Sequence, residues 1–430
     1  MDFFQYRDGQ LYAEDVNLDT LADQLGTPLY VYSRKTFEDH YGRIAEAFAP
    51  LDPTLCYSIK SCGNINILKL LVARGAGMDV VSGGELRRAQ AAGADMSKIV
   101  YAGVGKTDAE ITAALEAGIG YFNIESEAEF ENIARLAEQT GHTTHAALRV
   151  NPDVDPKTHT YTTTGKKESK FGVDLERARR FFESYGKNPH CRLTAVHIHI
   201  GSPVNDPQPY VDAINKVLAL IDDLRAAGYT VDTLDIGGGF GAHYESDEAP
   251  PAVTYAERIV PLLKDRDLKV ILEPGRSIAA NAGVLLSRVQ YIKTGGDKKF
   301  VIVDAGMNTL LRPSLYQAFH FLWPTKVDAK HVPEQRLKEM PNADLEPADV
   351  VGPICETGDF FAQHRALPPV KRGDLIAVFA AGAYGMVMAS NYNAMPRPAE
   401  VLVDGDNATI IRHRETYEDL LAHELEPQSV

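Results

Sequence analysis

The chain has 430 residues, of which 44% are hydrophobic and 24% are charged, a balance typical of globular proteins and not of disordered ones. Asp and Glu number 59 against 44 Lys and Arg, and the net charge of −15 argues against nucleic acid or an anionic membrane surface as a partner. This length exceeds one ordinary hydrophobic core, so we expect two domains.

No segment of the sequence looks like a targeting signal or an anchor. The first residues carry acids throughout and lack the apolar stretch of a secretory signal, and no apolar run approaches the ~20 residues that span a bilayer. We therefore expect a cytoplasmic protein. The four cysteines lack metal-ligand spacing and the 13 histidines form no HExxH pattern, so we expect neither a bound metal nor a disulfide framework.

Near the N-terminus, Thr27–Ser33 alternates like a strand and Arg34–Phe48 has helical spacing. From there to Arg276, short β-branched segments alternate with alanine- and charge-rich stretches of helical character. Eight such strand–helix units predict a closed (β/α)8 barrel of the TIM type, with its active site at the C-terminal mouth of the strands. The expected strands are Thr54–Lys60, Met78–Ser82, Ile99–Gly103, Tyr121–Glu125, His145–Asn151, Arg192–Gly201, Thr233–Gly239 and Lys269–Arg276.

After Arg276 the sequence becomes rich in Val, Ile and Phe, with Gly and Asp at the turns, which is typical of antiparallel sheet. We assign residues 34–278 to the barrel, and residues 1–33 with 279–430 to a β-rich domain, sandwich- or barrel-like, that the N-terminal strand joins. The polar stretch Val327–Asp349 is expected to be an excursion on the surface. The expected strands are Val284–Lys293, Lys299–Asp304, Leu375–Ala380, Glu400–Val403 and Ala408–Arg412.

A charged residue ends the first barrel strand, and another lies inside the second. Most lysines are solvated surface charges, but Lys60 closes a strand at the mouth, where partial desolvation would lower its pKa and let it attack an aldehyde as an amine. Asp79 lies inside the second strand, where an unpaired carboxylate is costly. Its partner is either backbone N–H groups or the Lys60 ammonium, and the sequence leaves both open.

Strict alternation over residues 196–202 directs both histidines of this segment into the barrel and the aliphatic side chains toward the helices. We expect His197 to be a hydrogen-bonded core residue. His199 lies nearer the mouth and is expected to stack on a flat cofactor.

The last two strands end in groups suited to an anion and to a ring nitrogen. Gly237–Gly239 allows backbone N–H groups to converge on a phosphate, and it does not match the dinucleotide pattern GxGxxG. Glu273 would need a cation or a protonated ring nitrogen, or alternatively an internal ion pair with Arg276. An amine, a stacking imidazole, a phosphate cradle and such a carboxylate are together the set that pyridoxal 5′-phosphate requires.

With these motifs, the chain resembles the diaminopimelate decarboxylase family of the alanine racemase-like, fold type III pyridoxal-phosphate enzymes. The resemblance runs nearly end to end. It includes Asp79–Leu86, Arg149–Val154, Lys170–Gly172, His197–Ser202, Gly237–Gly239, Glu273–Arg276, Asp304–Asn308, Arg312–Tyr316, Gly352–Asp359, Ala381–Gly385, Ser390–Asn393 and Arg397–Glu400.

The resemblance implies decarboxylation of meso-2,6-diaminopimelate to L-lysine and carbon dioxide, the last step of lysine biosynthesis. Its implied catalytic residues are Lys60, which binds the cofactor covalently, and His199. We add Cys355 as the acid that protonates the α-carbon, with a buried structural thiol as the alternative. The implied cofactor-binding residues are Lys60, Asp79, His199, Ser202, Gly238, Gly239, Glu273, Gly275, Arg276 and Tyr384. The implied substrate-binding residues are Arg276, Arg312, Tyr316, Glu356 and Tyr384.

The resemblance also implies a homodimer with shared active sites, in which Cys355 and Glu356 come from the partner chain. Three other functions stay open on the sequence. The chain is alternatively a decarboxylase of another basic amino acid or polyamine precursor on the same fold, a racemase on the same barrel, or a non-catalytic pyridoxal-phosphate carrier.

Overall fold

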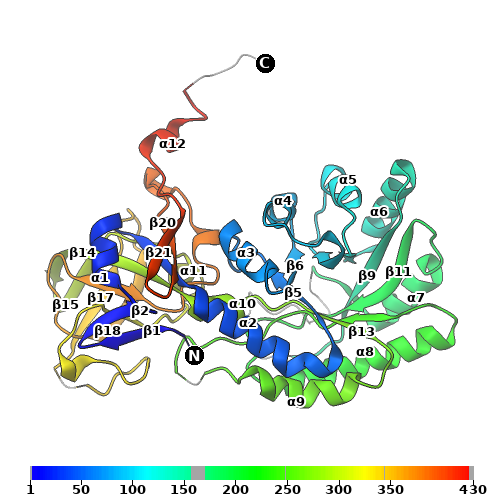
Figure 1. Ribbon diagram of the computed structural model, residues 1–430, viewed down its shortest axis with the longest axis horizontal. Helices are drawn as coiled ribbons and strands as arrows, with labels where there is room; N and C mark the ends of the chain where they lie inside the picture. Colours follow the sequence, from blue (N-terminus) through cyan, green and yellow to red (C-terminus); the bar gives the residue numbers. More distant parts are fainter. Residues whose placement is uncertain (1, 156–169, 247, 343, 426–430) are drawn as a thin grey trace. The chain divides into compact units, whose positions relative to one another are not determined.

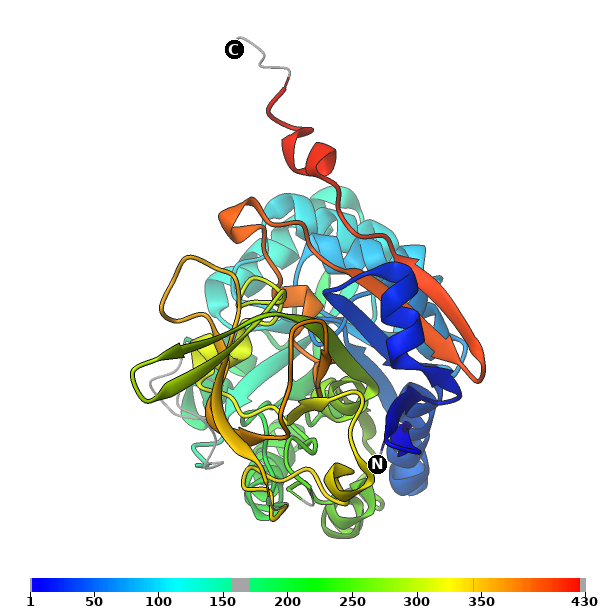
Figure 2. The same cartoon turned by 90° about the vertical axis from the view of Figure 1, so that its left-hand side faces the viewer.

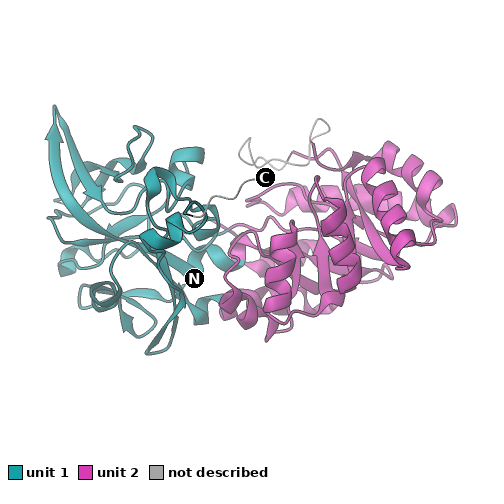
Figure 3. Ribbon diagram, turned by 90° about the horizontal axis from the view of Figure 1, so that it is seen from above, with its two compact units in different colours: residues 1–37, 242–248, 278–430 teal, residues 38–241, 249–277 magenta. Residues whose placement is uncertain are grey.

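The computed structural model describes residues 2–155, 170–246, 248–342 and 344–425. The chain divides into two compact units, shown in teal and magenta in Figure 3. Unit 1 comprises residues 1–37, 242–248 and 278–430, and unit 2 comprises residues 38–241 and 249–277. The expected barrel range of 34–278 thus includes residues 34–37, 242–248 and 278, which belong to unit 1. No helix in the described ranges has both the length and the hydropathy of a membrane span.

Within the described residues of unit 2, eight parallel strands form a closed ring, so the predicted (β/α)8 barrel is confirmed. Each strand pairs with the next along the chain, and the last pairs with the first. The strands are β5 (Thr54–Ser58), β6 (Gly77–Val80), β7 (Ile99–Tyr101), β8 (Tyr121–Ile124), β9 (Thr144–Asn151), β11 (Cys191–His197), β12 (Thr233–Asp235) and β13 (Lys269–Leu272), with β10 (Val173–Asp174) added beside β9.

Several strands end two to four residues earlier than the sequence predicts. The ladder stops at Ser58, His197, Asp235 and Leu272, so the residues expected to carry chemistry lie in the loops that follow. A backbone that turns out of the ladder can present its N–H groups and side chains at the barrel mouth.

Helices cover the outside of the barrel (Figure 1). Most begin at a side chain that accepts a backbone N–H of the first turn: Asn64, Ser82, Thr107, Ser126 and Asp174. Each cap therefore fixes where a loop ends and a helix begins. The helices are α2 (Arg34–Phe48), α3 (Ile65–Val72), α4 (Gly83–Ala91), α5 (Asp108–Ala117), α6 (Glu127–Thr140), α7 (Leu175–Tyr185), α8 (Gln208–Ala226), α9 (Ala252–Leu263) and α10 (Arg276–Ala279).

Unit 1 is built on a sheet of order β18-β17-β15-β14-β4-β20-β21, to which β19 adds through β14 and β16 through β19. The strand β4 pairs antiparallel with β14 and parallel with β20, so the expected entry of the N-terminal strand into this domain is confirmed (Figure 2). The strands are β4 (Leu29–Ser33), β14 (Gly283–Gly295), β15 (Lys298–Val303), β16 (Leu322–Pro324), β17 (Glu346–Val351), β18 (Phe360–Leu367), β19 (Leu375–Val378), β20 (Ala399–Asp404) and β21 (Asn407–Arg412).

One expectation for unit 1 is wrong in part. The end of Val327–Asp349 is not a surface excursion, because Glu346–Val351 forms β17 between β15 and β18. Ala348 and Val350 are buried in this strand. The sequence did not indicate the strand because its short apolar run is flanked by polar residues. A small sheet of β1 (Phe4–Arg7), β2 (Gln10–Ala13) and β3 (Val16–Asn17), with α1 (Leu18–Leu25), α11 (Arg312–Tyr316) and α12 (Tyr417–Leu421), completes the unit.

A buried lysine joins the mouth ends of two neighbouring barrel strands. Lys106 follows β7 with its side chain 1% exposed, and its Nζ donates to the carbonyls of Gly103 (2.8 Å) and Asn123 (2.9 Å). It also forms an ion pair with Glu129 at 2.5 Å. Burial raises the pKa of Glu129, and the lysine charge opposes that shift. Lys106 therefore ties the loop after β7 to strand β8 and to helix α6.

Replacing Lys106 should destabilise the protein strongly. Lys106→Met leaves the Glu129 carboxylate buried without its cation. We expect this change to lower the free energy of unfolding by about 3–5 kcal/mol. Urea denaturation measures the difference. The double variant Lys106→Met/Glu129→Gln should recover part of this loss, because an amide needs no counter-ion. As a control, Arg135→Met breaks the exposed pair with Asp108 and should cost less than about 1 kcal/mol. An equal loss of unfolding free energy in Lys106→Met and Arg135→Met would contradict the stabilising role of the buried Lys106–Glu129 pair.

Candidate active site

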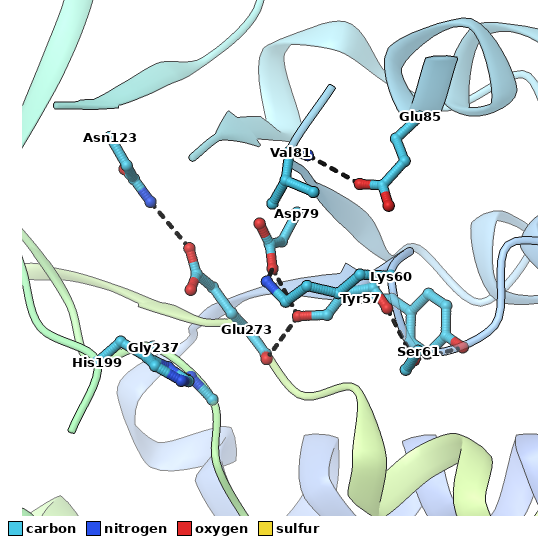
Figure 4. A network of polar contacts seen from close by, with 12 residues as sticks. Tyr57, Lys60, Ser61, Asp79, Val81, Glu85, Asn123, His199, Gly237 and Glu273 are labelled. Carbon is cyan, nitrogen blue, oxygen red and sulfur yellow. Dashed lines mark hydrogen bonds and ion pairs between the residues drawn. The ribbon is translucent and has the colours of Figure 1, made fainter. Parts of the chain in front are cut away.

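The first strands of the barrel bring a lysine and an aspartate together at the mouth. Lys60 Nζ lies 2.5 Å from Asp79 Oδ2, and Ser58 donates to the same oxygen at 2.6 Å (Figure 4). Asp79 is fully buried, and burial raises its pKa while the Lys60 ammonium lowers it. Of the two partners that the sequence left open for Asp79, the ion pair with Lys60 is confirmed.

A second carboxylate faces the barrel interior from the loop after β13. Glu273 accepts from Asn123 Nδ2 at 2.9 Å on one oxygen, and its other oxygen lies 3.3 Å from His197 Nε2. Both His197 and Glu273 are buried. The expectation that His197 is a hydrogen-bonded core residue is therefore confirmed, and Glu273 has partners that hold its orientation.

A third buried carboxyl group, that of Asp235, lies beside Glu273. Burial and the neighbouring negative charge of Glu273 raise the pKa of Asp235 well above its usual range. Burial alone would raise the pKa of Glu273, but the charge and hydrogen bond of His197, with Lys60 and Asp235, hold it below its ordinary value. Glu273 is thus an anion deep in the mouth, suited to a protonated ring nitrogen.

Sequence reasoning missed Asn123 and Asp235 as members of this site. Both are polar residues inside otherwise apolar strands, β8 and β12, and both are fully buried. A buried polar side chain needs a partner. That signal was present in the sequence, but only the closed ring of strands shows that Asn123 donates to Glu273 and that Asp235 lies beside it.

Glu85 adds a further carboxyl beside the lysine pair. It lies in the first turn of α4 and accepts the Val81 N–H at 2.8 Å (Figure 4). Burial raises its pKa to about 7, opposed by the Val81 hydrogen bond. Near neutral pH the Glu85 carboxyl is therefore only partly ionised.

His199 and the glycine run lie on the loops after β11 and β12. The Gly238 N–H approaches His199 Nδ1 at 3.4 Å. Burial lowers the pKa of His199 well below its usual range, and the charges of Arg149 and Lys60 lower it further. The imidazole is therefore neutral, which suits stacking on an electron-poor ring.

The glycines are required by close packing of the backbone. Gly239 has φ +104°, and a Cβ there would lie 2.2 Å from the Gly201 carbonyl oxygen. A Cβ on Gly238 would lie 2.1 Å from the Glu273 carbonyl oxygen. Side chains are excluded from this turn, so its backbone N–H groups are accessible to an anion.

Arg276 and Ser202 border this turn. Arg276 is buried, and its Nε donates to Ser202 Oγ at 3.0 Å. Gly275 is also tightly packed, since a Cβ there would lie 2.8 Å from Ser58 Cβ. A guanidinium, a hydroxyl and glycine amides together form a set of donors for a phosphate.

These residues fit pyridoxal phosphate. Among the described buried side chains, Asp79 Oδ1, Asn123 Oδ1 and His197 Nδ1 have no hydrogen-bond partner within the protein. Buried polar atoms without a protein partner are expected where a polar ligand binds. Lys60 would supply the amine for an aldehyde, Glu273 the anion for a ring nitrogen, and the glycine turn the phosphate cradle.

The remaining expected site residues belong to unit 1. Arg312 is buried at the start of α11, with Tyr316 at its end, and Tyr384 has φ +55°, a strained conformation that is frequent at functional sites. Cys355 and Glu356 are exposed on the loop before β18. The alternative reading of Cys355 as a buried structural thiol is therefore wrong.

The loop that carries these two residues is held by one aspartate. Asp359 is buried and accepts the N–H groups of Met307 (2.6 Å) and Ile354 (2.7 Å), one on each oxygen. The Cys355 N–H donates to Asn393 Oδ1 at 2.8 Å. The loop therefore presents Cys355 and Glu356 on a fixed backbone.

Comparison with known proteins identifies the family of the chain. Residues 34–280 match the family model described as pyridoxal-dependent decarboxylase, pyridoxal binding domain. The chain is 46% identical over 424 residues to diaminopimelate decarboxylase from Pseudomonas aeruginosa, covering 99% of each chain. It is 44% identical over 425 residues to the enzyme of that name from Aquifex aeolicus, covering 99% of this chain and 98% of the relative.

A solved structure of diaminopimelate decarboxylase from Helicobacter pylori complexed with L-lysine has a TM-score of 0.88 at 39% identity, covering 95% of this chain and 99% of that one. The fold and the site thus define a pyridoxal-phosphate-dependent decarboxylase with a (β/α)8 barrel and a β-rich second domain. Within that class, the chain belongs to the diaminopimelate decarboxylase family.

Gly239→Ala should weaken cofactor binding by about tenfold or more, because the methyl group must displace the backbone of the phosphate turn. Titration of the apoprotein with pyridoxal phosphate, followed by absorbance, measures the affinity. The matched control is Gly228→Ala, since Gly228 also has positive φ (+88°) but has nothing within 4 Å of the added methyl. Unchanged affinity in Gly239→Ala would exclude this turn as the cradle.

Proposed function

We propose that this chain removes carbon dioxide from the D-configured end of meso-2,6-diaminopimelate and releases L-lysine, the last step of lysine biosynthesis, in the cytoplasm. The observation that carries the proposal is the pairing of Lys60 with Asp79 and of Glu273 with His197 at one barrel mouth, in a member of this family. In this proposal, unit 2 holds the cofactor, and unit 1 supplies substrate and dimer contacts.

Pyridoxal phosphate, when bound, supplies an aldehyde for the substrate amine and a ring that withdraws electrons from the α-carbon as carbon dioxide leaves. Lys60 would hold the cofactor through its amine, and His199 would cover one ring face. Glu273 would keep a proton on the ring nitrogen. The phosphate would be held by Ser202, Gly238, Gly239, Gly275, Arg276 and Tyr384.

The chain's own side chains manage the protons. Whenever the Lys60 amine is free and protonated, it would have Asp79 as its partner, as in the ion pair at 2.5 Å. This pairing avoids a buried lone charge at Asp79. We assign the Cys355 thiol as the acid that delivers a proton to the α-carbon after carbon dioxide has left.

Substrate selection is assigned to charges complementary to the far end of diaminopimelate. Arg276 and Arg312 would bind its distal carboxylate, and Glu356 its distal ammonium, with Tyr316 and Tyr384 beside them. A site built from charged groups rejects analogues that lack the matching charge, because its own groups would go unpaired.

We propose that the active unit is a homodimer in which Cys355 and Glu356 complete the partner's site. Two features support this. Both residues are exposed on a loop whose backbone is fixed by Asp359. Large apolar side chains of the same unit are also exposed, namely Leu315, Val387 and Tyr392, which is common where a partner binds.

The reaction is tested by incubating the holoenzyme with meso-diaminopimelate and analysing the products. The parent should release carbon dioxide and L-lysine in equal amounts, and Lys60→Ala should lose activity by at least about 10³-fold. A panel with ornithine, arginine and lysine distinguishes other decarboxylases. Release of a stereoisomer without carbon dioxide would identify a racemase and overturn the proposal. Borohydride reduction should attach the cofactor to the peptide that contains Lys60.

The shared site is tested by complementation. Lys60→Ala and Cys355→Ala chains, each inactive alone, should recover up to about a quarter of the parent activity when co-expressed, because half of the dimers are mixed and each has one intact site. Co-expression of Lys60→Ala with the Lys60→Ala/Cys355→Ala double variant is the control and should stay inactive. No recovery in co-purified mixed dimers would show that each chain completes its own site.

A further inference from the structure

Arg312 is enclosed by two aromatic side chains of its own unit. Its Nη1 lies 2.8 Å from His320 Nε2, and its Cζ lies 4.6 Å from the centre of the Tyr244 ring. The Tyr244 and His320 rings meet edge to face at 5.3 Å. Arg312 and His320 are both buried. The hydrogen bond to His320 therefore holds the guanidinium within its plane, and the Tyr244 ring packs against its face.

The partners of His320 determine which of its nitrogens carries the proton. Its Nδ1 lies 2.9 Å from the carbonyl oxygen of Phe379, which only accepts, so Nδ1 carries the hydrogen. Arginine only donates, so Nε2 must accept from Arg312. Both nitrogens have a single consistent role, and the imidazole is neutral with its tautomer fixed.

The segment that carries Tyr244 is itself anchored to unit 1. The His243 N–H donates to Asn281 Oδ1 at 3.0 Å, and Asn281 Nδ2 donates back to the His243 carbonyl at 2.6 Å. The Ser246 N–H donates to the Arg336 carbonyl at 2.9 Å. Residues 242–248 interrupt unit 2 in sequence, and these bonds explain why they belong to unit 1 and keep Tyr244 on the face of Arg312.

The orientation of the guanidinium matters because a carboxylate is bound best by two parallel N–H groups in one plane. A long arginine side chain with freedom to rotate would present this plane only part of the time. We propose that His320 and Tyr244 are positioning residues that aim Arg312 at the distal carboxylate. They thereby set specificity for amines that carry a carboxylate at the far end over amines that lack one. This inference rests on the proposed role of Arg312.

The test uses two ligands that differ only in this carboxylate, L-lysine and cadaverine (1,5-diaminopentane). Their dissociation constants are measured by calorimetry on the holoenzyme, and their ratio reports carboxylate recognition alone. In the parent, L-lysine should bind more tightly. His320→Phe keeps an aromatic ring beside Tyr244 but removes both hydrogen bonds. It should lower the preference by about tenfold or more while cadaverine affinity stays within about twofold.

Conservative variants separate positioning from packing. His320→Gln restores an acceptor for Arg312 and should recover most of the preference. Tyr244→Phe keeps the ring face and should resemble the parent, whereas Tyr244→Leu should lose preference. The matched control is His331→Phe, because His331 is also buried in unit 1 and its Nε2 has no hydrogen-bond partner in the described protein. It should leave the ratio unchanged.

Arg312→Ala separates this inference from the function on which it rests. If Arg312→Ala abolishes the preference but His320→Phe and Tyr244→Leu keep it, the positioning role is overturned and the role of Arg312 stands. If Arg312→Ala itself keeps the preference, the assignment of Arg312 as carboxylate ligand is wrong, and the inference falls with it. If His320→Phe does not fold, the Tyr244→Leu and Tyr244→Phe pair decides.

Discussion

The barrel site depends on the pairing of charges that are held out of water. Asp79 and Glu273 are carboxylates inside an apolar ring of strands, and a lone buried charge would be costly. Asp79 is compensated by the ammonium of Lys60, and Glu273 by His197 and Asn123. Each pairing fixes one side chain to which we assign a role in binding the cofactor, so the same contacts would serve both stability and chemistry.

These pairings also assign different roles to chemically similar groups. Asp235, Glu273 and Asp79 are all buried carboxyls, yet the pKa of Asp235 is raised well above its usual range while that of Glu273 is held low. The difference arises from neighbours, since Glu273 faces His197 and Lys60 and Asp235 faces Glu273. A negative charge is thereby concentrated at one position in the barrel mouth. That position is where a protonated ring nitrogen is bound most favourably.

In unit 1, neighbouring side chains likewise act on a buried charged group, in this case an arginine. Arg312 is a buried cation whose orientation is controlled by a neutral histidine and a tyrosine ring. The histidine is neutral because a carbonyl and a guanidinium each permit only one role for its nitrogens. Two uncharged neighbours therefore contribute to the direction in which the Arg312 guanidinium points.

Much of the fold can be predicted from the sequence alone, because the periodicity that distinguishes strands from helices is visible within short segments. Repeated β-branched segments and amphipathic stretches predicted the eight-stranded barrel, and the alternation around His197 predicted that this histidine lies inside. Glycine at 237–239 and arginine at 276 could be recognised because such residue types have few other uses at strand ends. The strand β17 was missed, since six residues in a polar context carry too weak a local signal.

Tertiary structure alone decided which groups are partners. The choice of Lys60 over backbone amides for Asp79, the place of Asn123 and Asp235 beside Glu273, and the enclosure of Arg312 by Tyr244 and His320 all join residues from different strands or loops. Residue type and spacing determine whether a side chain points inward. They do not determine which inward side chain it meets, because that depends on the register of strands closing the ring and on how segments such as 242–248 return to the other unit.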